Sequence, residues 1–378
     1  MRRIFTAIAD YIRETDKLLL ALCLAASLFG SFMILSATNY TGSSRYFYVQ
    51  LIATFLGLAA AIVISLFDYK NIVRFWPLII GGSVALVLAT FWFGYTPEGS
   101  DDSAWLMLPG GLNLQPSELL KIAFSITFAK HVSMLREADL TKFRNVVLLA
   151  LHGVAPFALV VAQGDDGSAM ILFIIFLFMF FAAGVQLRYF AAGAAVIAIA
   201  APIAWFRVMD TWQKRRFLIL FDHDMDPLGI GWQQGQSISA IASGGTLGKG
   251  YMNGTYVQSG AVPKGYNDFI FASIGEELGF VGAFVAVLLL LLICLRILMI
   301  SRQSRDRAGM IICVGIFAMF AAQTIVNVGM CLYLLPVVGV TLPFFSAGGT
   351  SLLCLYLGIG LVLSVYKHRH KRVLSIGE

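Results

Sequence analysis

Long runs of apolar residues alternate with short polar segments along almost the whole chain. An apolar run of about 17 to 25 residues is long enough to cross a bilayer core as an α-helix. Such runs occupy residues 18–37, 47–67, 74–95, 117–133, 145–162, 168–186, 189–207, 270–295, 309–332 and 348–366. The pattern therefore predicts an all-α integral membrane protein with about ten transmembrane helices.

One longer interval, residues 208–267, carries no apolar run of membrane length. We expect it to be a large extracytoplasmic loop between helices 7 and 8 of a single polytopic domain, residues 1–378. Composition supports this class. Hydrophobic residues make up 59% of the chain, more than a soluble protein of this length can bury, and only 13% of the residues are charged. The five cysteines all fall within apolar runs and form no CxxC pair, so no disulfide framework is visible.

Positive charges predict the orientation, because loops rich in Lys and Arg stay on the cytoplasmic side. The first outer loop contains a single basic residue, Arg45. The other short outer loops carry neither Lys nor Arg: 96–116, 163–167 and 333–347. We therefore expect both termini to be cytoplasmic, with residues 1–17 as an interfacial helix on the inner leaflet and residues 367–378 as a tail. The net charge of +6 then reflects contact with membrane lipids and does not indicate nucleic acid.

Two charged residues stand at the start of the fourth apolar run. Glu118 and Lys121 are three positions apart and so share one face of a helix. In one interpretation Glu118 is a capping acid at the positive helix end, and Lys121 pairs with it inside the membrane. In the other, Lys121 faces a cavity and meets an anionic diphosphate, since intramembrane charges mark substrate pathways. Both can hold, because a paired lysine can exchange partners.

The outer turn GDDGSA, residues 164–169, adds Asp165 and Asp166. These carboxylates can cap the following helix. Together with other carboxylates they can instead hold a divalent cation.

The interval 208–267 has basic residues of its own. Arg215 and Arg216 are juxtamembrane anchors or phosphate ligands, because guanidinium binds phosphate oxygens as a bidentate fork. Lys249 lies in the glycine-rich SGGTLGKG, residues 243–250, and is a candidate phosphate contact. This segment is no Walker motif, since its spacing differs and no strand precedes it.

Three carboxylates lie at the start of the eighth apolar run, in DFIFASIGEELG, residues 268–279. Asp268 either caps this helix or serves as a general base at the rim of a polar cavity. Glu276 and Glu277 lie about two turns further along, where an unpaired charge would cost several kcal/mol. We therefore expect these two glutamates to line a polar cavity.

Five segments, in this order, resemble the signature segments of the bacterial SEDS family. They are QPSELLK (115–121), DPLGIGWQQGQS (226–237), SGGTLGKG (243–250), DFIFASIGEELG (268–279) and NVGMCLYLLPVVGVTLPFFSAGGTS (327–351). The match spans nearly the whole chain and includes the ten-helix layout of that family. The last segment is closer to the RodA branch, which serves cell elongation, than to the FtsW branch, which serves division.

The resemblance implies a peptidoglycan glycosyltransferase that polymerises lipid II on the outer face of the cytoplasmic membrane. It also implies a class B penicillin-binding transpeptidase and the elongation machinery as partners. Asp268 matches the family's essential aspartate, and Glu118 and Lys121 match its QPSE..K pair. Asp165 matches the acid of the QPD.G turn, and Arg216 an arginine that precedes DP.G.G. By the same matching, Gln236, Ser237 and Lys249 fall on the QS and GKG positions and are assigned to substrate binding.

The chain also departs from the family pattern. It reads PKGYNDFIF where many relatives read PExHTDFIF, so Tyr266 and Asn267 replace a common His and Thr. It has QGDDG in place of QPDLG and SAGGTS in place of SYGGTS. These changes disfavour a mechanism that needs a neighbouring histidine, and they leave the carboxylate of Asp268 intact.

The chemistry implied for lipid II suits these residues. Displacing the α-linked diphosphate to make a β-1,4 bond requires inversion, and a base must take the proton of the acceptor hydroxyl. We assign this role to Asp268. Arg216, Lys121 and a Mg²⁺ or Mn²⁺ ion held by acidic residues such as Asp165 would stabilise the departing diphosphate. The alternative is a lipid II flippase, but the halves show no internal repeat and the polar groups gather on the outer side.

Overall fold

The structure is a computed structural model that describes residues 13–96, 103–108, 112–222 and 229–369. Each of the ten apolar runs contains a helix, whose ends lie within a few residues of the prediction except where the eighth extends to Arg302. These helices are α2 (Lys17–Ala37), α3 (Arg45–Leu66), α5 (Trp76–Phe93), α6 (Pro116–Met134), α7 (Phe143–Gln163), α8 (Asp166–Ala182), α9 (Leu187–Arg207), α13 (Ile270–Arg302), α14 (Arg307–Cys331) and α15 (Gly349–Lys367).

Short elements connect them. They are η1 (Asn39–Thr41), α4 (Tyr69–Arg74), β1 (Leu106–Leu108), β2 (Leu112–Leu114), η2 (Glu137–Thr141), α10 (Thr211–Leu218), α11 (Ile230–Gly244) and α12 (Thr255–Gln258). The two strands pair antiparallel, with Met107 opposite Asn113.

Eight of the described helices are long and apolar enough to cross a membrane. Helix α8 is apolar but shorter, with 17 residues, and α6 carries Glu118 and Lys121 in its first two turns. The fold is an all-helical, multi-pass membrane protein, as the hydrophobic pattern predicted.

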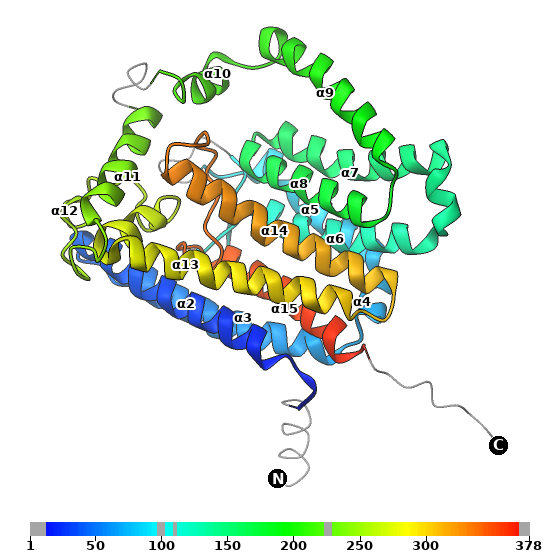
Figure 1. Ribbon diagram of the computed structural model, residues 1–378, viewed down its shortest axis with the longest axis horizontal. Helices are drawn as coiled ribbons and strands as arrows, with labels where there is room; N and C mark the ends of the chain where they lie inside the picture. The colour runs from blue at the N-terminus through cyan, green and yellow to red at the C-terminus, as the bar shows by residue number, and fades with distance from the viewer. Residues whose placement is uncertain (1–12, 97–102, 109–111, 223–228, 370–378) are drawn as a thin grey trace.

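The long helices lie side by side (Figure 1), and α14 and α15 are the most buried of the eight candidate membrane spans. Helix α14 packs against α13, α8 and α6, and α15 packs against α3. Helix α9 has no buried residue and arches away from the other helices (Figure 1). The core is therefore built on α14 and α15, and the site described below lies against them.

Small residues allow α3 and α15 to approach closely. A methyl group at Gly57 would lie 2.5 Å from the ring of Tyr356, and one at Gly360 would lie 2.9 Å from the Cα atom of Ala61. Helices in lipid gain little from hydrophobic association, so this close backbone packing supplies the contact between them.

Residues 229–267 of the predicted loop are folded onto the bundle. Helix α11 packs against α13 and α14, and the Gln234 side chain donates to the carbonyl oxygens of Met330 and Leu335. Residues 223–228 of the interval lie outside the described part.

The two ends of the described chain lie together. The Nζ atom of Lys367, at the end of α15, is 3.7 Å from a carboxylate oxygen of Glu14, and the first turn of α2 lies at the same end of the bundle (Figure 1). The interfacial helix predicted at 1–17 and the tail predicted at 367–378 fall largely outside the described residues.

Candidate active site

A cavity of about 540 Å³ opens among the ends of α3, α6, α8 and α15 and the segment before α13. The charged side chains that line it are Arg45, Glu118, Lys121, Asp165, Lys264 and Asp268. The structure thus brings together four residues that the sequence nominated from three distant segments: Glu118, Lys121, Asp165 and Asp268. Their roles in binding or catalysis stay predictions.

Asp268 is held on the cavity wall through its backbone. Its carbonyl oxygen accepts a hydrogen bond of 2.8 Å from the Asn327 side chain, which also donates to the carbonyl of Val340. The preceding carbonyl, of Asn267, accepts from the Ser346 hydroxyl at 2.7 Å. These bonds fix the backbone on α14 and the 332–348 segment, and they leave the carboxylate of Asp268 free to face the cavity.

The side chain of Asp268 is not a helix cap. Helix α13 has Phe269 at its N-cap position and no side-chain capping bond. Asp268 is only 5% exposed, and its Oδ2 atom lies 3.6 Å from Nζ of Lys264. Burial raises the pKa of the Asp268 carboxyl above its ordinary value, while the Lys264 ammonium group acts in the opposite direction.

Glu118 and Lys121 form a buried ion pair. Their Oε1 and Nζ atoms are 2.7 Å apart, and both side chains are less than a tenth exposed. The second oxygen of Glu118, Oε2, has no hydrogen-bond partner in the described protein. A buried acceptor of this kind costs free energy unless something else donates to it. The pair therefore presents an unused acceptor beside the cavity.

Asp165 is the N-cap of α8, because its Oδ1 atom accepts from the backbone N–H of Ser168. Its Oδ2 atom accepts from the side chains of Gln115 and Ser117. Both oxygens are thus engaged within the protein. Among the described residues no group of three or more His, Cys, Asp or Glu side chains could hold a metal ion. The predicted Mg²⁺ or Mn²⁺ ion therefore has no such group of ligands among these residues, and its binding stays a prediction.

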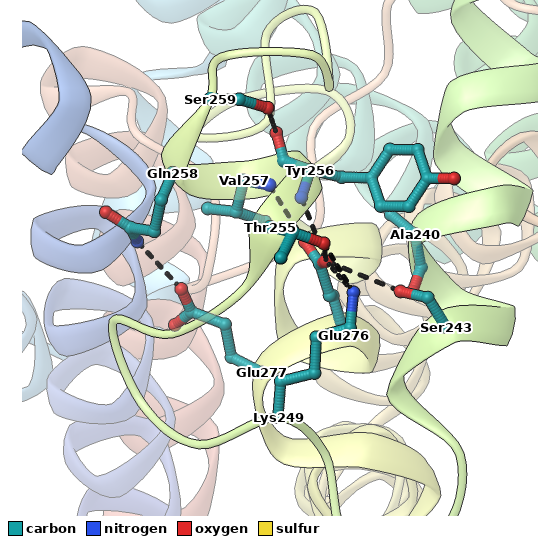
Figure 2. A network of polar contacts seen from close by, with 10 residues as sticks. All are labelled: Ala240, Ser243, Lys249, Thr255, Tyr256, Val257, Gln258, Ser259, Glu276 and Glu277. Atoms are coloured by element: carbon teal, nitrogen blue, oxygen red, sulfur yellow. Dashed lines mark hydrogen bonds and ion pairs between the residues drawn. The ribbon is translucent and has the colours of Figure 1, made fainter.

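Lys249, Glu276 and Glu277 do not line this cavity. The Glu276 carboxylate accepts from Nζ of Lys249 at 2.7 Å and from the backbone N–H groups of Tyr256 and Val257 (Figure 2). Glu277 accepts from the side chains of Gln258 and Ser36. The expectation that the two glutamates line a polar cavity is wrong, because both are fully buried in contacts that anchor the 249–258 segment.

Three other predicted binding residues also lie away from the cavity. Arg216 is on α10, with its guanidinium 3.5 Å above the Trp212 ring. Ser237 is buried and donates to the carbonyl of Cys331 at 2.9 Å, which holds α11 on α14. Gln236 precedes it on α11, and its side chain is outside the cavity lining. Their role in substrate binding stays a prediction.

Sequence reasoning overlooked several cavity residues. Arg45 was used only for orientation, and Lys264 only as part of a motif. Gln50 and Gln323 lie inside apolar runs, and both line the cavity. A polar side chain within a membrane span is itself a signal of function, and that signal would have found the two glutamines.

Taken together, the fold and the cavity define a multi-pass membrane protein with a buried, charge-lined site at one end of its helices. A family model described as a cell cycle protein, FtsW/RodA/SpoVE, matches residues 16–371. The chain therefore belongs to the FtsW/RodA/SpoVE family.

Named relatives agree with this membership. The peptidoglycan glycosyltransferase MrdB of Escherichia coli is 32% identical over 360 residues, which cover 95% of each protein. The probable peptidoglycan glycosyltransferase FtsW of Geobacter metallireducens is 32% identical over 367 residues, covering 94% of this chain and 95% of that protein.

Solved structures show the same fold. A chain of a peptidoglycan synthase complex superposes with a TM-score of 0.81 at 27% identity, covering 95% of this chain and 99% of the other. The crystal structure of Thermus thermophilus RodA superposes with a TM-score of 0.70 at 24% identity, covering 95% and 98%.

Proposed function

We propose that this chain, a peptidoglycan glycosyltransferase of the SEDS family, polymerises lipid II into β-1,4 glycan strands at the outer face of the cytoplasmic membrane, with Asp268 as the general base. The observation that carries the proposal is the Asp268 carboxylate, uncapped and held through its backbone on the wall of a charge-lined cavity. The similarity to peptidoglycan glycosyltransferases supports the substrate class.

The reaction needs a base for the acceptor hydroxyl and positive charge for the departing diphosphate. The acceptor hydroxyl oxygen attacks the anomeric carbon of the donor, and its proton passes to the Asp268 carboxylate. The bond from that carbon to the diphosphate breaks, and the electron pair leaves with the diphosphate. Inversion follows because attack and departure are on opposite faces of the sugar.

Positive charge stabilises the diphosphate as it departs. Lys121 and Arg45 are on the cavity wall, and Lys121 is already desolvated, with its side chain only 1% exposed. A desolvated cation interacts more strongly with a developing negative charge than a solvated one does. The ammonium group of Lys121 has three N–H donors and gives one to Glu118, so it can also donate to a phosphate oxygen when the substrate binds.

The direct test is polymerisation of fluorescent lipid II by the purified protein. General-base catalysis contributes about 100 to 10,000-fold, so Asp268→Ala and Asp268→Asn should lower the rate by that factor. Asp139→Asn is the matched control, because that aspartate also pairs with a lysine but is on the exposed η2 segment. Undiminished polymer from both Asp268 variants would refute the assignment, and lipid II translocation without polymer would support a flippase.

A class B penicillin-binding transpeptidase is the proposed partner. Support comes from the similar chain that belongs to a peptidoglycan synthase complex. Co-reconstitution with the transpeptidase should raise the rate of polymerisation, and an equal rate with and without it would remove this part of the proposal.

The role in elongation rests on the resemblance of residues 327–351 to the RodA branch. Depletion in the native cell should give rounded cells if the chain serves elongation. Filaments of undivided cells would assign it to division instead.

A further inference from the structure

Lys264 is a cation on the wall of the Asp268 cavity. It lies four residues before Asp268, in the turn that leads into α13. Its charge lies beside the proposed base, so the structure around it bears on how that base works.

The distance between the Lys264 ammonium group and the Asp268 carboxylate distinguishes a hydrogen bond from a purely electrostatic attraction. The Nζ atom of Lys264 is 3.6 Å from Oδ2 of Asp268, which is beyond a hydrogen bond but well within reach of Coulomb attraction. The aspartate side chain is 7% exposed and the lysine side chain 30% exposed. The ammonium group can therefore stabilise the negative charge while leaving the oxygen able to accept a proton from another donor.

The turn holds Lys264 in this place. Its backbone φ is +49°, in the left-handed region that non-glycine residues rarely adopt. Its carbonyl oxygen accepts from the backbone N–H groups of Asn267, at 2.9 Å, and Phe269, at 3.2 Å. These two bonds close the turn and bring positions 264 and 268 to the same side. Strained backbone of this kind clusters at functional sites.

The charged groups on the Asp268 cavity come from the 264–268 turn and from three helices. They are Lys264 on the same turn, Arg45 on α3, Glu118 and Lys121 on α6, and Asp165 at the start of α8. The other titratable neighbours are Tyr266, whose pKa burial raises, Tyr46 and Tyr95, which also line the cavity, and Cys331 on α14, whose thiol faces the Asp268 carbonyl. Lys121 is neutralised by Glu118 at 2.7 Å. Lys264 is thus the cation in direct ion-pair distance of the Asp268 carboxylate in the described structure.

We infer that Lys264 is a positioning residue for the glycosyl transfer, whose ammonium group keeps the Asp268 carboxylate ionised without forming a hydrogen bond to it. The inference rests on the proposed function, because it concerns the base of that reaction. An opposite charge at this distance lowers the pKa of a carboxyl. A base works only when ionised, so activity is present above the pKa of Asp268 and is lost as the pH falls through it.

The experiment compares the pH profile of lipid II polymerisation in the full-length wild type, Lys264→Met and Lys264→Arg. Methionine keeps the length of the side chain and a similar backbone cost at φ +49°. The acid limb of Lys264→Met should move upward by about one unit or more, with activity regained at alkaline pH. Lys264→Arg should keep the wild-type limb. Lys142→Met removes a lysine that pairs with Asp139 on the exposed η2 segment, and it should leave the profile unchanged.

An infrared pH titration of the carboxyl band, assigned by its loss in Asp268→Asn, reads the protonation of Asp268 without any substrate. The same upward shift should appear there in Lys264→Met. An unmoved band, or a loss of polymerisation that is equal at every pH, would overturn the inference and make Lys264 a substrate contact or a structural residue. If the band moves but no variant polymerises lipid II, the proposed function fails while the electrostatic role of Lys264 stands.

Discussion

At the scale of single residues, three buried carboxylates have basic partners at short distance. Glu118 pairs with Lys121 and Glu276 with Lys249, each at 2.7 Å, and Asp16 pairs with Arg296 at 2.5 Å. Removing one member of a buried pair leaves an uncompensated charge and costs about 3–5 kcal/mol, whereas replacing both is often neutral. A pair that is only structural should therefore tolerate replacement of both members, whereas a functional pair should lose activity even when stability is regained.

The Glu118–Lys121 pair is suited to that comparison. Lys121→Met should destabilise the protein by about 3–5 kcal/mol, because Glu118 keeps its burial and loses its cation. The double variant Glu118→Gln/Lys121→Met should regain most of that stability and still polymerise lipid II poorly, because the cation proposed for the diphosphate is gone. Thermal unfolding in detergent and the polymerisation assay measure the two effects. A double variant with wild-type activity would make the pair structural only.

Residue identity predicted part of this site. Asp268, Glu118, Lys121 and Asp165 were found because charge near an apolar run is conspicuous in sequence, and the structure places all four on one cavity. Glu276 and Lys249 were equally conspicuous but pair with each other. A sequence shows that a buried charge needs a partner, and it does not show whether that partner is substrate or protein.

At the scale of elements, the break in α13 explains the glycine-rich segment. Gly279 has φ +66°, so the helix is interrupted there. The N–H groups of Phe280 and Val281 donate to the carbonyls of Gly245 and Thr246, and the carbonyls of Glu276 and Glu277 accept from Lys249 and Gly250. A helix break inside a membrane protein is tolerated when other backbone satisfies the freed groups. The SGGTLGKG segment does so here.

A methyl group at the break should therefore be costly. In Gly279→Ala the new Cβ would lie 2.3 Å from the backbone nitrogen of Gly248, in a left-handed conformation that alanine disfavours. We expect a marked loss of thermal stability, beyond the 1–3 kcal/mol typical of backbone strain alone. Gly81→Ala, within α5 and with nothing within 4 Å of the added methyl, should be neutral or stabilising by up to about 1 kcal/mol. Equal unfolding temperatures for both variants would contradict this account of the break.

The elements themselves followed from the hydrophobic pattern, because a helix that crosses lipid must be predominantly apolar. The polar interval 208–267 did not follow in the same way. The Ser237 side chain of α11 donates to a carbonyl of α14, and the Tyr256 backbone N–H of α12 donates to the Glu276 carboxylate. Such bonds leave no periodic signal in sequence.

At the scale of the whole molecule, the cavity exists because distant segments converge at one end of the bundle. The Tyr46 ring on α3 lies 4.7 Å from that of Tyr266, and the Asn39 side chain donates to that of Gln258 at 2.9 Å. The α2–α3 loop is therefore on the same side as the segment that carries Asp268. Helix packing brings these segments together, and no single segment could predict that. The side of the membrane that the cavity faces follows only from the distribution of Lys and Arg.

That orientation can be measured with cysteine labelling, because all five native cysteines are buried and should give little background. Ser44 is exposed in the α2–α3 loop and makes no capping bond, and Ala138 is exposed in the segment between α6 and α7. If loops poor in Lys and Arg are outside, Ser44→Cys should react with an impermeant maleimide in intact cells, and Ala138→Cys only after permeabilisation. Labelling of the unmodified protein sets the background. The opposite pattern would place the Asp268 cavity on the cytoplasmic side, where strands built at the outer face could not be made. The proposed polymerase activity therefore depends on this result as much as on the carboxylate.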